Sequence, residues 1–95
     1  MIHIEVHKRV SKKMRALGPE AVAEAEKRLA QLAADFGNPH IHSGLGLRKI
    51  ARRNYEIRVW LQWRIVLVHN GDWLLADDVL NHDGISLWLR TRGNR

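Results

Sequence analysis

The feature that most constrains this chain is a run of strand-forming residues from Tyr55 to His82, rich in Val, Ile, Leu and Trp. β-Branched and aromatic side chains favour strands, and the Asn70-Gly71 dipeptide is a strong signal for a hairpin turn. We therefore predict a three-stranded antiparallel meander with strands at 55–60, 63–69 and 73–80. The middle strand is apolar on both faces, which is typical of a central strand.

The residues before this run predict one strand and two helices. Ile2, Ile4 and Val6 alternate with polar residues, as in a strand that buries one face. Apolar residues then recur at helical spacing over 8–17 and again over 19–36. Pro19 is expected in the first turn of the second helix, and the Gly-Asn-Pro sequence at 37–39 is expected to end it.

The remaining segments are harder to assign from periodicity. We predict a polar loop at 40–46, a short strand within 45–50 and a turn at 51–54. The tail from Asp83 has one apolar cluster and ends in a basic segment that we expect to be frayed. The whole chain, 1–95, is predicted to be a single α+β domain, with two helices on one face of an antiparallel sheet and the other face open.

The composition excludes several kinds of chemistry. The chain has 95 residues and no cysteine, which excludes disulfides, thiolate nucleophiles and cysteine-based zinc sites. No apolar run approaches the roughly 18 residues of a membrane span. The first residues also lack the pattern of a secretory signal, so we expect a cytoplasmic protein that has no membrane partner.

The charge balance suggests a polyanionic or acidic partner. Sixteen Lys and Arg residues oppose ten Asp and Glu residues, giving a formal net charge of +6. The basic residues form two clusters, one over 8–15 and one over 48–53. From them we select six candidates for contacts to RNA phosphates: Lys12, Lys13, Arg48, Lys49, Arg52 and Arg53. The alternative is that these clusters are simply solvated surfaces.

Arg58 and Arg64 are unusual because each lies within a largely apolar predicted strand. A guanidinium group in such a place costs free energy unless it has a partner or a function. A two-residue loop at 61–62 would point the two side chains to opposite faces. We predict a three-residue loop at 60–62, which places Arg58 directly opposite Arg64. The alternative is that they form cross-strand pairs with Glu56, Asp77 or Asp78.

The order of motifs resembles that of the RelE/ParE superfamily of type II toxins. The resemblance is carried by four segments: Leu-Arg-Lys-Ile at 47–50, Tyr-Glu-Ile-Arg-Val at 55–59, Trp-Arg-Ile-Val at 63–66 and Asn-His-Asp at 81–83. It implies a small toxin that is silenced in a complex with a co-encoded acidic antitoxin. RelE-type members cut messenger RNA at the ribosome without a metal, through attack of the RNA 2′-hydroxyl on the adjacent phosphate.

The resemblance also implies roles for four residues. Arg58 matches the basic residue of the Tyr-x-Ile-basic motif, and Arg64 matches the arginine that follows the aromatic residue opening the next strand. His82 falls where the family has a histidine or arginine, and Trp88 lies near a terminal aromatic residue that is usually Tyr or Phe. An indole cannot act as an acid or base as a phenol can, so we expect Trp88 only to stack on a base.

This reaction requires positive charge at the phosphate and groups that transfer protons, and the candidate residues suit these roles differently. Arginine suits the phosphate because its planar fork donates paired hydrogen bonds and remains charged. His82 is the best acid–base candidate, since imidazole ordinarily titrates near neutral pH; the alternative is a surface histidine at a strand end. Glu56 shares a strand face with Arg58 and is a second candidate base, or it simply pairs with that arginine.

Other candidate sites are weaker. His40 and His42 have the spacing of a metal-binding pair but lack a third ligand, so we predict no metal and no other cofactor. Asp77 and Asp78 are adjacent on a strand and face opposite sides, which argues against a paired-carboxylate hydrolase. Two functions other than an endoribonuclease remain open: a ParE-like inhibitor of DNA gyrase, and a non-catalytic RNA-binding or antitoxin-scaffold domain.

Overall fold

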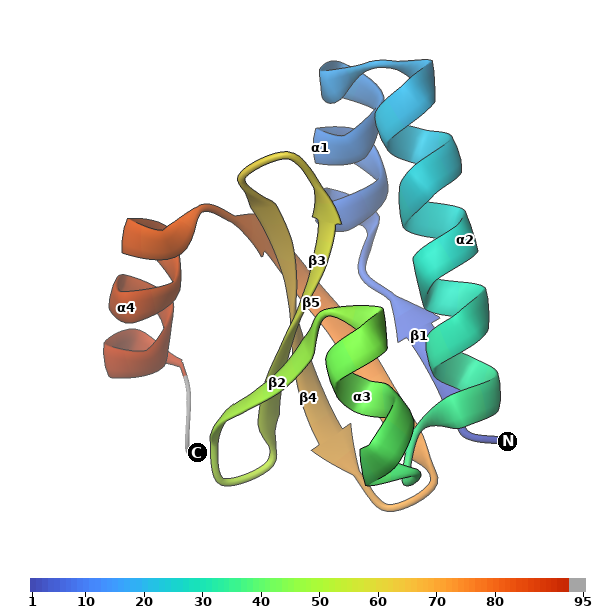
Figure 1. Cartoon of the computed structure of the whole chain (residues 1–95). Helices are drawn as coiled ribbons and strands as arrows, with labels where there is room; N and C mark the ends of the chain where they lie inside the picture. The colour runs from blue at the N-terminus through green and yellow to red at the C-terminus, as the bar shows by residue number, and fades with distance from the viewer. Residues whose placement is uncertain (93–95) are drawn as a thin grey trace.

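The computed structural model describes residues 1–92, without the side chains of Pro39, His40 and Ser43. Its elements are shown in Figure 1 and follow this order: β1 (His3–Val6), α1 (Lys8–Leu17), α2 (Pro19–Asp35), α3 (Pro39–Leu45), β2 (Leu47–Ala51), β3 (Asn54–Trp60), β4 (Trp63–Asn70), β5 (Trp73–Leu80) and α4 (His82–Thr91). The α+β class and the two helices before the meander are as the sequence predicts. No helix within residues 1–92 combines the length and hydropathy of a membrane span.

The strands form one five-stranded sheet in the order β1-β5-β4-β3-β2. Neighbouring strands from β2 to β5 are antiparallel, so the predicted three-stranded meander is extended by β2. β1 is parallel to β5 and pairs with it from His3–Trp73 to Val6–Ala76. The helical hairpin of α1 and α2 separates β1 from the rest of the sheet in sequence.

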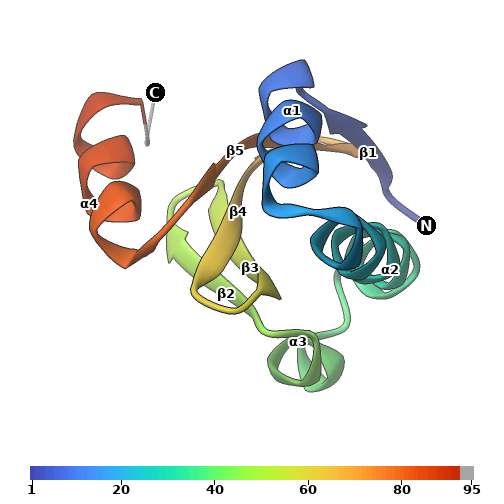
Figure 2. The same ribbon diagram turned by 90° about the horizontal axis from the view of Figure 1, so that it is seen from above.

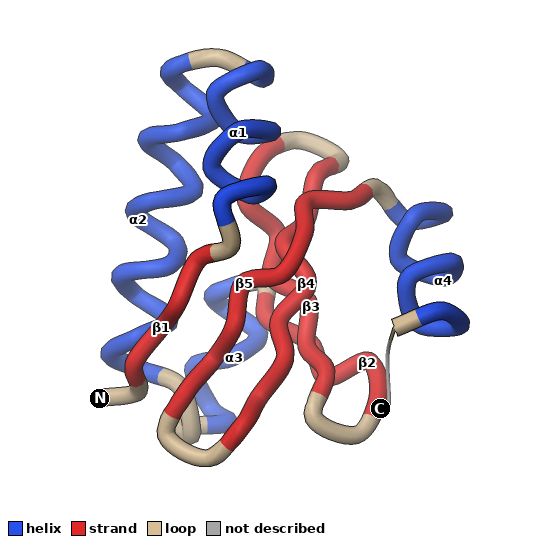
Figure 3. The backbone as a smooth tube through the Cα atoms, turned by 180° about the vertical axis from the view of Figure 1, so that it is seen from behind, coloured by secondary structure: helices blue, strands red, loops and turns tan. Residues whose placement is uncertain are grey.

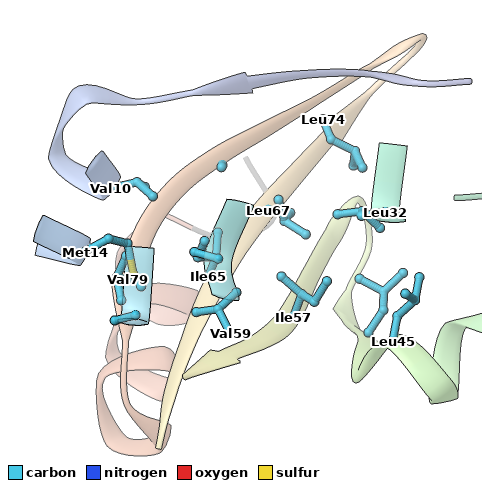
Figure 4. Packing of buried hydrophobic residues seen from close by; sticks show 14 residues of the cluster. Val10, Met14, Leu32, Leu45, Ile57, Val59, Ile65, Leu67, Leu74 and Val79 are labelled. Atoms are coloured by element: carbon cyan, nitrogen blue, oxygen red, sulfur yellow. The ribbon is translucent and has the colours of Figure 1, made fainter. Parts of the chain in front are cut away.

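The main core lies between the sheet and the hairpin of α1 and α2, as Figure 2 shows from above. Alternate strand residues, among them Ile57, Ile65 and Leu67, belong to the same core cluster as Leu32 of α2 and are fully buried (Figure 4). Burying one such side chain contributes about 1.5–3 kcal/mol. The side chains that alternate with these along β3 and β4 therefore face away from this helical layer.

Helix α4 was not predicted, and it changes the opposite face of the sheet. The Asn81 Oδ1 atom caps it by accepting a hydrogen bond from the Gly84 N–H at 2.9 Å. Ile85 and Trp88 pack against Val66 in a second small cluster on the side of the sheet away from α1 and α2. Figures 1 and 3 show α4 apart from the other helices, beside the sheet. The prediction of a fully open face was therefore wrong, because α4 covers part of it.

A short helix also replaces the loop predicted at 40–46. Helix α3 covers residues 39–45 and ends at Gly46, where the φ angle is +73°. Proline at its start and glycine just after its end are the residues that favour these positions. The sequence signal was missed because a seven-residue helix is too short to show clear periodicity.

The hairpin between β3 and β4 has the predicted residue pairing but not the predicted loop length. Arg58 lies directly opposite Arg64, as predicted. The loop itself, however, has only the two residues Leu61 and Gln62, and the register shift lies in β3 between Arg58 and Trp60. Val59 is thus the extra residue of a β-bulge. Leu61 adopts a φ angle of +48°, an unfavourable conformation for a leucine.

Candidate functional site

Four residues line up across the sheet and define what we call the arginine row: Gly46, Arg58, Arg64 and Leu80. Arg64 pairs with Arg58 on one side and with Leu80 on the other. The Arg58 N–H donates to the Gly46 carbonyl oxygen at 3.2 Å, which extends the row to the edge of the sheet. Both arginines lie on the face away from α1 and α2, because their neighbours Ile57 and Ile65 fill the main core.

Arg58 is exposed and has no ion pair or side-chain hydrogen bond with any described residue. Gly46 helps to leave it uncovered. A Cβ atom on Gly46 would lie 3.3 Å from the Arg58 Cβ, closer than an ordinary van der Waals contact. The guanidinium group of Arg58 is therefore available to a ligand.

Glu56 is the acidic partner of this site. It is 4% exposed, and its Oε1 atom lies 3.0 Å from Arg48 Nη2 and 3.9 Å from Arg64 Nε. Its Oε2 atom is buried without a hydrogen-bond partner in the described structure. Glu56 thus pairs with Arg48 and Arg64, and not with Arg58 as the simpler sequence interpretation expected.

The site carries an excess of positive charge. Two guanidinium groups, those of Arg48 and Arg64, lie near the carboxylate of Glu56, and Arg58 adds a third positive charge on the same face of the sheet. Like charges directly opposite each other on neighbouring strands are destabilising, so the Arg58–Arg64 pair weakens the sheet when no anion is bound. Planar guanidinium groups are well suited to hold the oxygen atoms of a phosphate.

His82 begins α4 just beyond the arginine row. It is exposed and follows Leu80, the residue opposite Arg64, by two positions. Consecutive Cα atoms are about 3.8 Å apart, so the His82 Cα lies within roughly 8 Å of the Leu80 Cα. The chain therefore brings an imidazole to the same end of the sheet as the two arginines.

Trp88 has a different environment from the one predicted. It is 4% exposed, and its Nε1–H donates to Asp77 Oδ2 at 2.8 Å. A buried ring cannot stack on a base, so the prediction that Trp88 contacts RNA was wrong. The physical reason is that α4 needs an apolar face against Val66, and Trp88 supplies most of it.

The other predicted RNA contacts are not gathered at the arginine row. Lys49 pairs with Tyr55, which packs against the main core, so Lys49 lies on the opposite side of the sheet from Glu56. Arg52 and Arg53 form the turn between β2 and β3. This turn is four residues along the strand from Arg48, about 13 Å away.

The two candidate lysines of α1 belong to the helical layer. Lys12 is exposed. The Nζ atom of Lys13 is 2.6 Å from Asp78 Oδ1 and 3.3 Å from the Val79 carbonyl oxygen. Lys13 therefore contributes to the contact between α1 and β5.

Of the two histidines considered as a metal pair, His42 is the one whose side chain is described. Among the described side chains, no cluster of three His, Asp or Glu groups has the arrangement of a metal site. The Nε2 atom of His42 accepts a hydrogen bond from the Gly37 N–H at 3.1 Å. The side chain of His40 lies outside the described part of the chain.

Two residues of the site were missed by sequence reasoning. Gly46 was assigned to the overlap of a loop and a short strand, although a glycine within a strand often marks a close approach of another backbone. Asp77 was considered as a neighbour of Asp78 and as a cross-strand partner of Arg58 or Arg64, yet it is buried and bonded to Trp88. Its role depends on α4, which the sequence did not reveal.

Compared as a sequence, the chain matches no family profile and no curated protein. Its fold is similar to that of YafQ from E. coli strain BL21(DE3), with a TM-score of 0.54 and 11% identity over 90% of this chain and 98% of YafQ. It is also similar to HP0894 from Helicobacter pylori, with a TM-score of 0.51 and 15% identity over 87% of this chain and 97% of HP0894. The described chain therefore shares its overall fold with these two proteins.

Proposed function

We propose that this protein is the toxin of a toxin–antitoxin pair and that it cuts messenger RNA at the ribosome. The two structural neighbours are RelE-like toxins, which supports a toxin with the same fold. The single observation that favours RNA cleavage is the arginine row, where Arg58 and Arg64 lie side by side on the face away from α1 and α2. A site of this kind is expected in the cytoplasm, where ribosomes translate.

In the proposed reaction, the two arginines bind the scissile phosphodiester. The RNA 2′-hydroxyl attacks the adjacent phosphorus, its proton is removed, and the bond to the 5′-oxygen breaks as that oxygen gains a proton. The products are a 2′,3′-cyclic phosphate and a free 5′-hydroxyl. Negative charge increases on the phosphate oxygens in the transition state, and preorganised guanidinium groups are suited to stabilise it. No metal or other cofactor is required.

His82 is assigned to proton transfer because it is the imidazole at this end of the sheet. Glu56 is less suited to that role, since its carboxylate is buried between arginines. We instead assign Glu56 to holding Arg64 and Arg48 in place. Arg48 is largely exposed and can contact a neighbouring phosphate.

A non-catalytic RNA-binding domain is the second candidate function. Trp88 supports it, because the family position that usually carries Tyr or Phe is here a buried indole. In that case the arginine row would bind RNA without cutting it. A ParE-like gyrase inhibitor has the same fold but has no need for two arginines and a histidine at one end of the sheet.

Induced expression in bacteria separates these functions. Cells would express the wild-type protein or Arg64→Ala, and both the 5′ ends of messages and the breaks in DNA would be mapped. The nuclease predicts new message ends with the wild-type protein and loss of these ends with the variant. Gyrase-dependent DNA breaks without message cleavage would contradict it, and so would growth arrest without either kind of damage.

An antitoxin partner is the other part of the proposal. The basic surface suits an acidic protein that would neutralise the toxin in a hetero-oligomer. Co-expression of a small acidic protein encoded beside this one should suppress growth arrest and co-purify with the chain. Arrest that is unchanged by the neighbouring product would count against the pairing.

A further inference from the structure

A buried carboxylate, that of Asp77, joins three elements of the fold. Its Oδ2 atom accepts the Trp88 indole N–H at 2.8 Å and lies 3.4 Å from Arg92 Nη1, at the end of α4. Its Oδ1 atom lies 3.5 Å from Arg9 Nη2 of α1. Asp77 is only 9% exposed, and the two guanidinium groups balance its charge. It therefore links β5 to α4 on one side and to α1 on the other.

Asp77 reaches α4 because of an irregularity in β5. Val66 pairs with Asp78 and the next residue, Leu67, pairs with Ala76, so Asp77 is the extra residue of a β-bulge. A bulge redirects a side chain relative to a regular strand. The adjacent Asp78 bonds to Lys13 of α1. The two neighbouring carboxylates thus connect β5 to different partners, and only Asp77 contacts α4.

Few buried groups hold α4 in place. Its buried residues are Ile85 and Trp88, which pack against Val66. A buried indole N–H requires a hydrogen-bond acceptor, and Asp77 supplies it. This directional bond fixes the rotation of α4 about its axis more strictly than apolar contacts do. The first residue of the same ten-residue helix is His82.

We propose that Asp77 is a positioning residue for His82. Through the Trp88 indole it holds α4 in the orientation that keeps the imidazole at the end of the sheet where Arg64 pairs with Leu80. This inference rests on the proposed function, in which His82 transfers a proton. It also assigns Trp88 a role that Tyr or Phe could not fill in the same way, because Phe lacks a donor and the donor of Tyr lies at a different point of the ring.

The first test compares variants of adjacent residues. Asp77→Asn and Trp88→Phe should each lower kcat for cleavage of ribosome-bound message by about 10-fold or more, with KM changed less than about twofold. Asp78→Asn is the matched control, since it removes the same charge from the next residue but leaves α4 untouched; its kcat should remain within about threefold of wild type. Trp88→Phe keeps an aromatic ring in the cluster, so it remains informative if Asp77→Asn fails to fold.

A double-variant cycle shows whether Asp77 acts through His82. In a His82→Ala background, Asp77→Asn should cause no further loss of rate, because the group that it positions is already absent. A loss of the same size with and without His82 would assign Asp77 a merely structural role and overturn the inference.

A second readout is independent of cleavage. In NMR spectra, the ring signals of His82 should shift in Asp77→Asn and in Trp88→Phe but not in Asp78→Asn. Unchanged His82 signals in both variants would overturn the positioning role even in an active nuclease. If the wild-type protein cut no RNA but the His82 signals responded as expected, the proposed function would fail while the link from Asp77 to His82 stood.

Discussion

Arg58 and Arg64 lie directly opposite each other on β3 and β4, on the face of the sheet that α1 and α2 leave uncovered. Two like charges in this position destabilise the sheet. The nearest carboxylate to Arg64 in an ion pair is that of Glu56 on the neighbouring strand, at 3.9 Å. A chain selected only for stability would not keep this pair of arginines. The arrangement is explained if an anionic ligand completes the site.

Replacing Arg58 should therefore stabilise the fold. Arg58→Thr keeps a strand-forming residue and removes the repulsion, so we expect the free energy of unfolding to rise by up to about 1 kcal/mol. Urea denaturation followed by circular dichroism measures this change. A loss of stability greater than about 1 kcal/mol would show that Arg58 contributes to folding and would weaken its assignment as a ligand-binding residue.

Gly46→Ala should disturb both the fold and the site. The φ angle of +73° strains any residue with a Cβ, and that Cβ would lie 3.3 Å from the Arg58 Cβ. We expect a loss of about 1–2 kcal/mol in the free energy of unfolding and a clear fall in RNA cleavage. Gly71→Ala is the matched control, because Gly71 has a φ angle of +60° and a Cβ added there would meet no atom within 4 Å. It should lose similar stability and keep full cleavage; equal losses of cleavage would contradict the role of Gly46.

Glu56→Gln should change how the protein binds RNA. Removing the carboxylate that lies between Arg48 and Arg64 raises the positive charge of the site by one. A non-cleavable RNA should therefore bind more tightly, and the logarithm of its affinity should depend more steeply on salt, by roughly one unit of slope. At the same time we expect slower cleavage, because Arg64 loses a contact that orients it. Fluorescence titrations at several salt concentrations measure the slope, and an unchanged slope would place Glu56 outside the site.

His82→Ala should reduce cleavage by about 100-fold to 10,000-fold, the usual contribution of a general acid or base. The fold should be unaffected because His82 is exposed at the start of α4. RNA affinity should also change little, since the proposed phosphate contacts come from the arginines. Addition of free imidazole should restore part of the rate. Cleavage by His82→Ala at the wild-type rate would remove His82 from the reaction.

The sequence predicted the parts of this fold that have strong periodicity. The meander, α1 and α2 followed from alternation and helical spacing, and the pairing of Arg58 with Arg64 followed from the need to place both on one face. The bulge at Val59 that produces this pairing was not predictable, because it depends on Leu61 accepting a φ angle of +48°. The two-residue turn imposes this conformation on Leu61, which is 75% exposed, and the local preference of a leucine opposes it.

The role of Trp88 shows why the rest of the site could not be predicted. Its position in the motif suggested an exposed aromatic residue near the RNA. The structure buries it because α4 folds back on Val66, and Asp77 accepts its N–H. Both contacts join residues that are distant in sequence, so no local pattern reveals them. The motif located the histidine and the arginines but not the packing that surrounds them.

The most direct test of the account is the single-turnover rate of cleavage of ribosome-bound message by purified Arg58→Ala and Arg64→Ala proteins. Arg90→Ala, which removes an exposed arginine of α4, serves as the control. If the arginine row binds the scissile phosphate, each of the first two variants should lose at least about 100-fold in rate, while the control stays within about twofold of wild type. Wild-type rates for Arg58→Ala and Arg64→Ala would contradict the account.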